Sequence, residues 1–104
     1  MTDKEIEQEI QEKGLTAPRV TLEHVNSVIE AEDYYVFQDV LTVCCLLLKN
    51  GFTVTGESAC ASPENYDEEL GRKIAKENAV NKIWALEGYL LRQKLHEQTI
   101  NIGM

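Results

Sequence analysis

The most constraining feature of this 104-residue sequence is the almost wholly apolar run at residues 40–48, VLTVCCLLL. A helix that is hydrophobic on all sides lies in the core of its protein, so we expect a central buried helix from Asp39 to Asn50. Gly51 is then predicted to end it in the left-handed conformation. We interpret Asn50-Gly51 as a helix cap rather than a hairpin turn, because the preceding residues do not alternate between apolar and polar.

Two further helices are expected before this run. Residues 2–13 are typical of a helix that Thr2 caps, because acidic side chains fill its first turn. Thr21 caps a second helix over residues 22–31. Residues 32–37, EDYYVF, fit either a short strand or the entry to the central helix.

The segment after Gly51 predicts an extended stretch that leads into a long helix. Residues 52–55 alternate between apolar and polar with a period of two. Gly56 breaks this pattern, and residues 56–62 are small except for Glu57. A small side chain lets another group approach the backbone closely. Ser62 at the cap and Pro63 at the first helical position mark a helix start, and we expect this last helix to continue to about His96.

The predicted fold class is therefore mainly α. It has three to four helices, a long C-terminal helix and a short extended segment at 52–56. We divide the chain into an acidic, mobile N-terminal helix (1–15), a single domain (16–97) and a loose tail (98–104). A chain this small buries only roughly 60–65% of its unfolded surface, and the last helix has a broad apolar arc. We therefore expect homo-oligomerisation to complete the core.

Charge and length exclude several classes of protein. A formal net charge of −8 opposes general binding to nucleic acids, whose affinity comes from cations that release counterions. The apolar run is far shorter than the about 20 residues of a membrane span, and the charged N-terminus does not fit a signal peptide. Three cysteines, of which Cys44 and Cys45 are adjacent, fit a reducing compartment. We expect a cytoplasmic protein without membrane contact.

The junction between the small residues and the last helix is the candidate ligand site. Backbone N–H groups and the helix dipole there favour an anion, and three cations follow on the same helix. The candidate residues are Thr55, Gly56, Glu57, Ser58, Ala59, Cys60, Asn65, Arg72, Lys73 and Lys76. The alternative is that Ser62 only caps the helix, acidic residues satisfy its dipole, and the cations form a solvated face.

The sequence contains little that points to a catalytic site or a metal site. Cys60 precedes a helix N-terminus, which lowers a thiol pKa, but its base would have to be His24 or His96, and nothing in the sequence places either one nearby. No metal-ligand spacing joins the histidines to Cys44, Cys45 or Cys60. We expect no catalytic residue, no metal and no cofactor, and hence no enzyme.

Two other patterns have a plain interpretation beside a functional one. The acidic stretch at residues 5–12 could imitate nucleic-acid phosphates, but charge runs are usually solvated. The aromatic residues Tyr34, Tyr35 and Phe37 could stack on bases. Packing in the core or at a subunit interface is the better explanation for them.

A resemblance to a known family adds context. The run at residues 49–95, with its string GFTVTGESACASPENYD, resembles a family of small proteins of tailed bacteriophages and prophages, described by its coliphage and Shigella-phage members. The TAPRVT segment at 16–21 and the apolar run before Lys49 are similar to the same family. The resemblance implies a phage accessory gene in the cytoplasm of an infected bacterium and supplies no enzymatic activity.

These observations lead to two functional hypotheses. The first is a non-enzymatic phage accessory protein that counters host defence by sequestering a small anionic, nucleotide-type signal at the junction. The second is a protein-protein interaction module that inhibits or redirects a host or phage protein. The second would use the apolar arc of the last helix together with the N-terminal helix.

Overall fold

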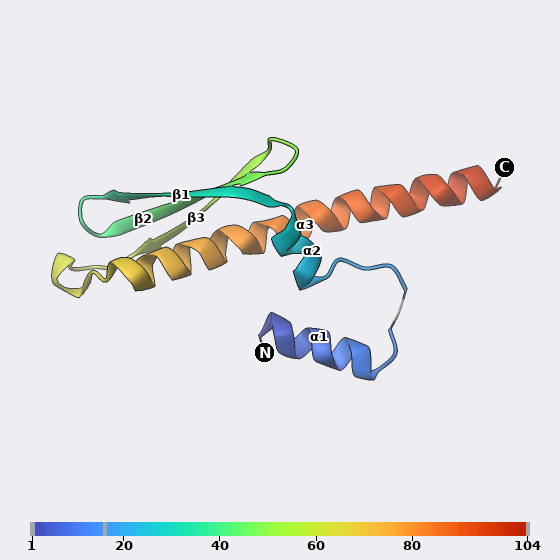
Figure 1. Cartoon of the computed structure of the whole chain (residues 1–104), viewed down its shortest axis with the longest axis horizontal. Helices are drawn as coiled ribbons and strands as arrows, with labels where there is room; N and C mark the ends of the chain where they lie inside the picture. Colours follow the sequence, from blue (N-terminus) through green and yellow to red (C-terminus); the bar gives the residue numbers. More distant parts are fainter. Residues whose placement is uncertain (1, 16, 104) are drawn as a thin grey trace.

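A computed structural model describes residues 2–15 and 17–103 of the chain (Figure 1). The elements follow in the order α1 (Asp3–Glu12), α2 (Leu22–Ser27), β1 (Ile29–Phe37), β2 (Leu41–Leu48), β3 (Thr53–Ala59), the 3-10 turn η1 (Pro63–Asn65) and α3 (Glu68–Gly103). Thr16, where the expected domain begins, and Met104, the end of the expected tail, lie outside the described residues.

The strands form one antiparallel sheet in the order β1-β2-β3. Tyr34 of β1 pairs with Cys44 of β2, and Cys44 pairs with Gly56 of β3. Helix α3 packs along one face of this sheet, against β2 and β3, and then continues well beyond it (Figure 1). The chain is thus an α+β protein, and the prediction of a mainly α fold is wrong.

The apolar run is the central strand β2 and not a buried helix. It has a strand on each side, and successive side chains point to opposite faces of the sheet. Asn50-Gly51 is accordingly a hairpin turn and not a helix cap. Gly51 has φ 92° and its N–H donates to Leu48 O at 2.9 Å, while Asn50 Oδ1 accepts from Phe52 N at 3.0 Å. The segment predicted at 52–56 is extended, but it runs on through Gly56 to Ala59.

The turn between β1 and β2 uses two residues that rarely adopt positive φ. Gln38 has φ 53° and Asp39 has φ 56°, and Val40 N donates to Phe37 O at 3.2 Å. Positive φ at both central positions matches the right-handed twist of the strands. The ambiguous residues 32–37 are therefore a strand, and the second predicted helix ends early, at Ser27.

The helix starts agree in part with the sequence. The N-terminal helix is confirmed, and the Thr2 side chain accepts from Glu5 N as its cap. Helix α3, in contrast, begins at Glu68 and not at Pro63. Asp67 caps it by accepting from Leu70 N at 2.9 Å, whereas the Ser62 side chain makes no capping bond. The helix also continues past its expected end near His96.

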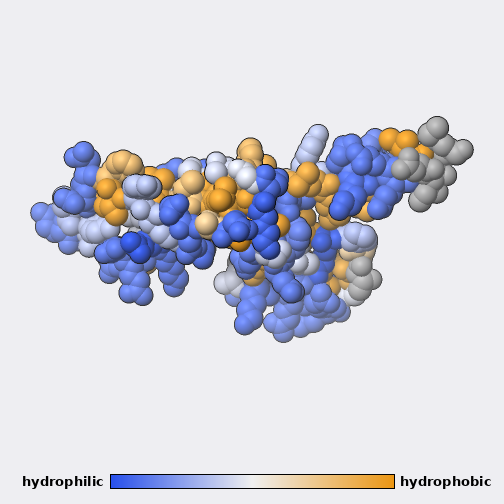
Figure 2. All heavy atoms as spheres, turned by 45° about the horizontal axis from the view of Figure 1, so that its top comes forward, coloured by the Kyte–Doolittle hydropathy of each residue, from blue (hydrophilic) through white to orange (hydrophobic). Residues whose placement is uncertain are grey.

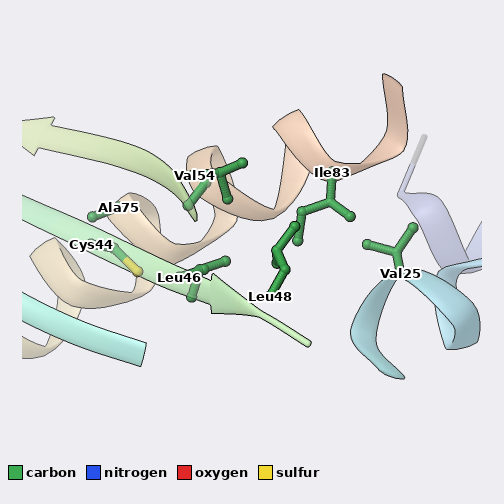
Figure 3. Close-up of a cluster of buried hydrophobic side chains, with 8 residues drawn as sticks. Val25, Cys44, Leu46, Leu48, Val54, Ala75 and Ile83 are labelled. Carbon is green, nitrogen blue, oxygen red and sulfur yellow. The ribbon is translucent and has the colours of Figure 1, made fainter. Parts of the chain in front are cut away.

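The hydrophobic core lies between the sheet and α3 (Figure 3). The buried side chains come from the helix-facing side of β2 and β3, from one side of α3 and from α2. They are Val25, Cys44, Leu46, Leu48, Val54, Ala75, Ala79 and Ile83. The helix residues are four apart, so they form a single stripe on the side that faces the sheet.

Gly56 sets the distance between α3 and the sheet. A Cβ atom at this position would lie 2.2 Å from both Ala75 O and Ala79 N. The small residues after Gly51 were expected to let another group approach the backbone. At Gly56 that group is helix α3 of the same chain. Two alanines on the facing side of α3 complete the close contact.

The molecule is elongated. Its radius of gyration is 17.4 Å, against about 13 Å for a compact domain of roughly 100 residues. The second half of α3 accounts for this shape because it projects beyond the sheet (Figure 1). Within residues 2–15 and 17–103, no helix combines the length and apolar character needed to cross a membrane.

Two ion pairs attach the N-terminal helices. Arg19 donates to both carboxylate oxygens of Glu7, with Nη1 2.7 Å from Oε1. His24 Nε2 lies 2.6 Å from Glu87 Oε1 and ties α2 to α3. Helix α1 is therefore attached by the bidentate contact between Glu7 and Arg19. A shallow hollow lies beside this contact, between α1 and Trp84.

The contact at Gly56 gives the first prediction. Gly56→Ala should lower the free energy of unfolding by about 2–3 kcal/mol, because the added methyl group meets helix backbone that has to shift. Gly88→Ala is the matched control, since a Cβ there meets nothing within 4 Å. It should raise stability by about 0.5–1 kcal/mol through helix propensity. Urea denaturation measures both changes, and equal effects would contradict the close contact.

The attachment of α1 should depend on pH. Hydrogen bonds from Arg19, and then from Gln11, lower the pKa of Glu7 from 4.5 to about 2. A carboxyl group whose pKa is depressed in the folded state stabilises that state above its ordinary pKa, and this contribution is lost as pH falls. We expect α1 to detach between pH 4.5 and about 2.

The single tryptophan, Trp84, lines the hollow beneath α1, so its fluorescence follows the detachment. Glu7→Gln removes the titrating carboxyl group and should abolish the transition in this pH window. The same acid transition in the wild type and in Glu7→Gln would show that Glu7 is not responsible.

Candidate functional site

The candidate residues of β3 do not form one loop. They belong to a strand, so their side chains alternate between the faces of the sheet. Gly56 and Ser58 lie on the side of α3, in register with Cys44 and Thr42. Thr55, Glu57 and Ala59 lie on the opposite face, which sends the candidate residues to two different surfaces.

The three cations also separate. The Arg72 guanidinium lies over the Tyr34 ring, 5.1 Å from its centroid, and Nη2 is 3.1 Å from Glu68 Oε1. Lys76 Nζ is 2.7 Å from Glu32 Oε2. Arg72 and Lys76 therefore both reach from α3 to β1. Lys73 is exposed. It follows Arg72 directly, and successive residues of an α-helix are rotated by about 100°, so Lys73 points to a different side of α3.

The junction of β3, η1 and α3 holds a small hollow of about 120 Å³. It brings together four of the candidate residues: Ser58, Ala59, Cys60 and Asn65. Pockets for small-molecule ligands usually exceed about 300 Å³. This hollow has room for a few water molecules but not for a nucleotide.

The electrostatics of this hollow do not favour an anion. Asp67 lines it and already occupies the helix N-terminus as the cap. Thr42 lines it as well, from the central strand. The Thr42 side chain is 1% exposed, and its hydroxyl finds no hydrogen-bond partner within the described part of the chain. A buried hydroxyl without a protein partner lowers the stability of the fold unless water in the hollow satisfies it.

A second group of charged and aromatic side chains lies on the helix-facing side of β1. Helix α3 packs on β2 and β3, so Tyr34 stays only half-buried and Val36 is 42% exposed. We call Glu32, Tyr34 and Val36 the β1 shelf. Arg72 and Lys76 border it, with Arg72 over the Tyr34 ring and Lys76 paired with Glu32.

The tyrosine of the β1 shelf is held in its neutral form. Burial raises the pKa of Tyr34 to about 12, and the neighbouring Cys44 adds to this shift. Burial likewise raises the pKa of the Cys44 thiol. Sequence reasoning considered Tyr34 for base stacking but preferred packing as its role, and it did not select Glu32. The one available signal was the placement of Arg72 and Lys76 four residues apart, which puts them on the same side of a helix.

The residues considered for catalysis lie apart. Cys60 Sγ is 3.7 Å from Val40 O at the η1 end of the sheet, whereas His24 pairs with Glu87 where α2 meets α3. Among residues 2–15 and 17–103, no group of three or more histidine, cysteine or acidic side chains could hold a metal ion.

The buried hydroxyl of Thr42 yields a test of the hollow. Thr42→Val keeps the shape of the side chain and removes an unpaired polar group, so it should raise the free energy of unfolding by about 1 kcal/mol. Thr42→Ser, which keeps the hydroxyl and loses the methyl group, is the control and should lower it. Thermal unfolding measures both. A loss of stability in Thr42→Val would mean that the hydroxyl has a partner in the hollow.

Comparison with known proteins gives the chain a family. Neither a curated protein nor a solved structure matches it. The profile of the phage protein (N4 Gp49/phage Sf6 gene 66) family matches residues 20–95, which include the whole sheet and most of α3. The chain therefore belongs to the N4 Gp49/phage Sf6 gene 66 family of phage proteins.

Proposed function

We propose that this phage protein is a non-enzymatic binding protein that sequesters a small anionic ligand of nucleotide type and thereby counters a host defence signal. The observation that carries the proposal is the pair of cations at the β1 shelf, with Arg72 over the Tyr34 ring and Lys76 beside Glu32. A nucleotide offers a phosphate to the cations and a flat base to the aromatic and apolar side chains.

The ion pairs at the β1 shelf suit exchange with a ligand. The side chains of Arg72 and Glu68 are 50% and 64% exposed, and those of Lys76 and Glu32 are 44% and 41% exposed. Exposed pairs of this kind contribute about 0–1 kcal/mol. A phosphate accepts bidentate hydrogen bonds from Arg and forms stronger charge-assisted contacts, so it can replace the two carboxylates at low cost.

The chemistry around the β1 shelf supports binding rather than turnover. The nearest thiol is Cys44, which is buried, and its raised pKa keeps it protonated. Tyr34 is neutral for the same reason. A nucleophile needs an adjacent base or a lowered pKa, and neither group meets that requirement. We place this binding activity in the cytoplasm of the infected bacterium.

Calorimetric titration tests the proposal. The wild type is titrated with cyclic nucleotides and nucleotide-sugar signals, and thermal shifts are recorded in parallel. The variant Arg72→Ala/Lys76→Ala should weaken binding at least about 100-fold, because it removes two cations and each charged hydrogen bond contributes about 1.5–3 kcal/mol. If none of the compounds binds or stabilises the wild type, the nucleotide proposal is wrong.

Lys82→Ala is the matched control for this titration. Lys82 is an exposed cation of α3, but it precedes the buried Ile83, whereas Lys76 follows the buried Ala75. It therefore lies on the opposite flank of the helix. It should leave affinity unchanged, and an equal loss in this variant would indicate attraction to net charge without a defined site.

A protein-interaction module is the second candidate, and a separate observation favours it. Phe52, Tyr89 and Leu90 are exposed around an apolar hollow of about 310 Å³, where α3 leaves the sheet. Exposed apolar clusters of this kind mark binding surfaces. A pull-down from host lysate tests this function. A host or phage protein that binds stoichiometrically to the wild type and to Arg72→Ala/Lys76→Ala, but not to Tyr89→Glu, would favour it.

A further inference from the structure

The face of the sheet opposite α3 is uncovered and apolar along its centre. Paired residues of neighbouring strands point to the same side, so the register defines its members. They are Ala31, Asp33, Tyr35 and Phe37 of β1, Leu41, Val43, Cys45 and Leu47 of β2, and Thr53, Thr55, Glu57 and Ala59 of β3. We call this surface the open face. Hydrophobic side chains gather over the sheet and along α3 in Figure 2.

The pattern of β2 indicates that the open face is buried in the working protein. An antiparallel sheet with one solvated face alternates between apolar and polar residues, whereas a strand covered on both faces is apolar throughout. β2 is of the second kind, yet among the described residues it is packed against a helix on one face, that of α3. Tyr35 remains 65%, Phe37 51% and Leu47 38% exposed.

The open face is complementary in shape to itself. Its β1 side carries large rings, Tyr35 and Phe37, and its β3 side carries smaller side chains, among them Thr55 and Ala59. A two-fold axis that runs along β2, between two such faces, places β1 of one copy over β3 of the other. Rings then meet small side chains on both sides of the axis, as an isologous interface requires.

The register also makes the charges compatible. Tyr35, Val43 and Glu57 form one row across the sheet, so the axis along β2 brings the hydroxyl of Tyr35 opposite Glu57 of the partner subunit. In the next row, formed by Asp33, Cys45 and Thr55, Asp33 meets the hydroxyl of the partner subunit's Thr55. In both rows a carboxylate meets a hydroxyl donor, and no carboxylate meets another.

The other aligned arrangement, with the axis across the strands, is less favourable. It places β1 on β1 and β3 on β3. Rings then meet rings on one side of the interface, and small side chains face each other across a gap on the other. Glu57 also comes near the partner subunit's Glu57, and like charges at a desolvated interface are repulsive.

We infer that two copies of the chain pack their open faces together, with the two-fold axis along β2 and Tyr35 of each copy against Glu57 of the other. The sheets form a sandwich, with a helix α3 on each outer surface. The β1 shelf lies on the other side of β1, so this interface is independent of the ligand proposed above. Arg72→Ala/Lys76→Ala should still form the dimer.

Sedimentation equilibrium tests the interface. The wild type should have twice the chain mass of 11.8 kDa, or an even multiple of it. Val43→Glu, which places a charge at the centre of the open face, should halve the observed mass and keep its circular dichroism. Phe52→Glu, which changes an exposed ring outside the open face, is the control and should not alter the mass. A monomeric wild type, or a Val43→Glu protein of unchanged mass, overturns the inference.

A charge reversal at Tyr35 tests the register. Tyr35→Lys sets an ammonium against the carboxylate of the partner subunit's Glu57, whereas Tyr35→Glu sets a second carboxylate there. Tyr35→Lys should therefore dimerise at least about 10-fold more tightly than Tyr35→Glu. With the axis across the strands, both variants bring like charges together and weaken the dimer equally, so equal dissociation constants would overturn the proposed register.

Discussion

The close contact between α3 and β3 at Gly56 is the constraint on which the rest of the structure depends. The absence of a side chain there, with Ala75 and Ala79 opposite, lets the helix lie directly on the strand backbone. Helix α3 is thereby fixed over β2 and β3, to one side of the sheet. The β1 shelf exists because α3 packs on β2 and β3 and not on β1. The position of the candidate ligand site therefore follows from the contact at Gly56.

The same placement explains how two surfaces with different chemistry coexist on a three-stranded sheet. On the helix side, β1 presents the Tyr34 ring beneath Arg72 and the Glu32 carboxylate beside Lys76. On the opposite side, it presents Tyr35 and Phe37 beside the apolar residues of β2. The proposed ligand and the proposed second copy therefore use alternate residues of one strand and do not compete.

The sequence predicted the structural features that depend on neighbouring residues, such as the Thr2 cap, the extended stretch after Gly51 and a long final helix. It failed where contacts with segments distant in the sequence decide the structure. The run at 40–48 lacks alternation because both faces of β2 are apolar, and periodicity alone cannot separate such a strand from a buried helix. Gln38 and Asp39 turn the first hairpin without a glycine. The β1 shelf was hidden for a related reason, since only the strand register brings Tyr34 and Glu32 to Arg72 and Lys76.

The order of the elements has a kinetic consequence. β1, β2, β3 and α3 each pack on the element that precedes them in the chain, so the core is built from contacts between neighbouring segments. Loops of this kind close at little entropic cost, and chains rich in such contacts fold faster than chains built from distant ones. Each newly synthesised chain therefore spends little time with an unpaired strand edge exposed to aggregation.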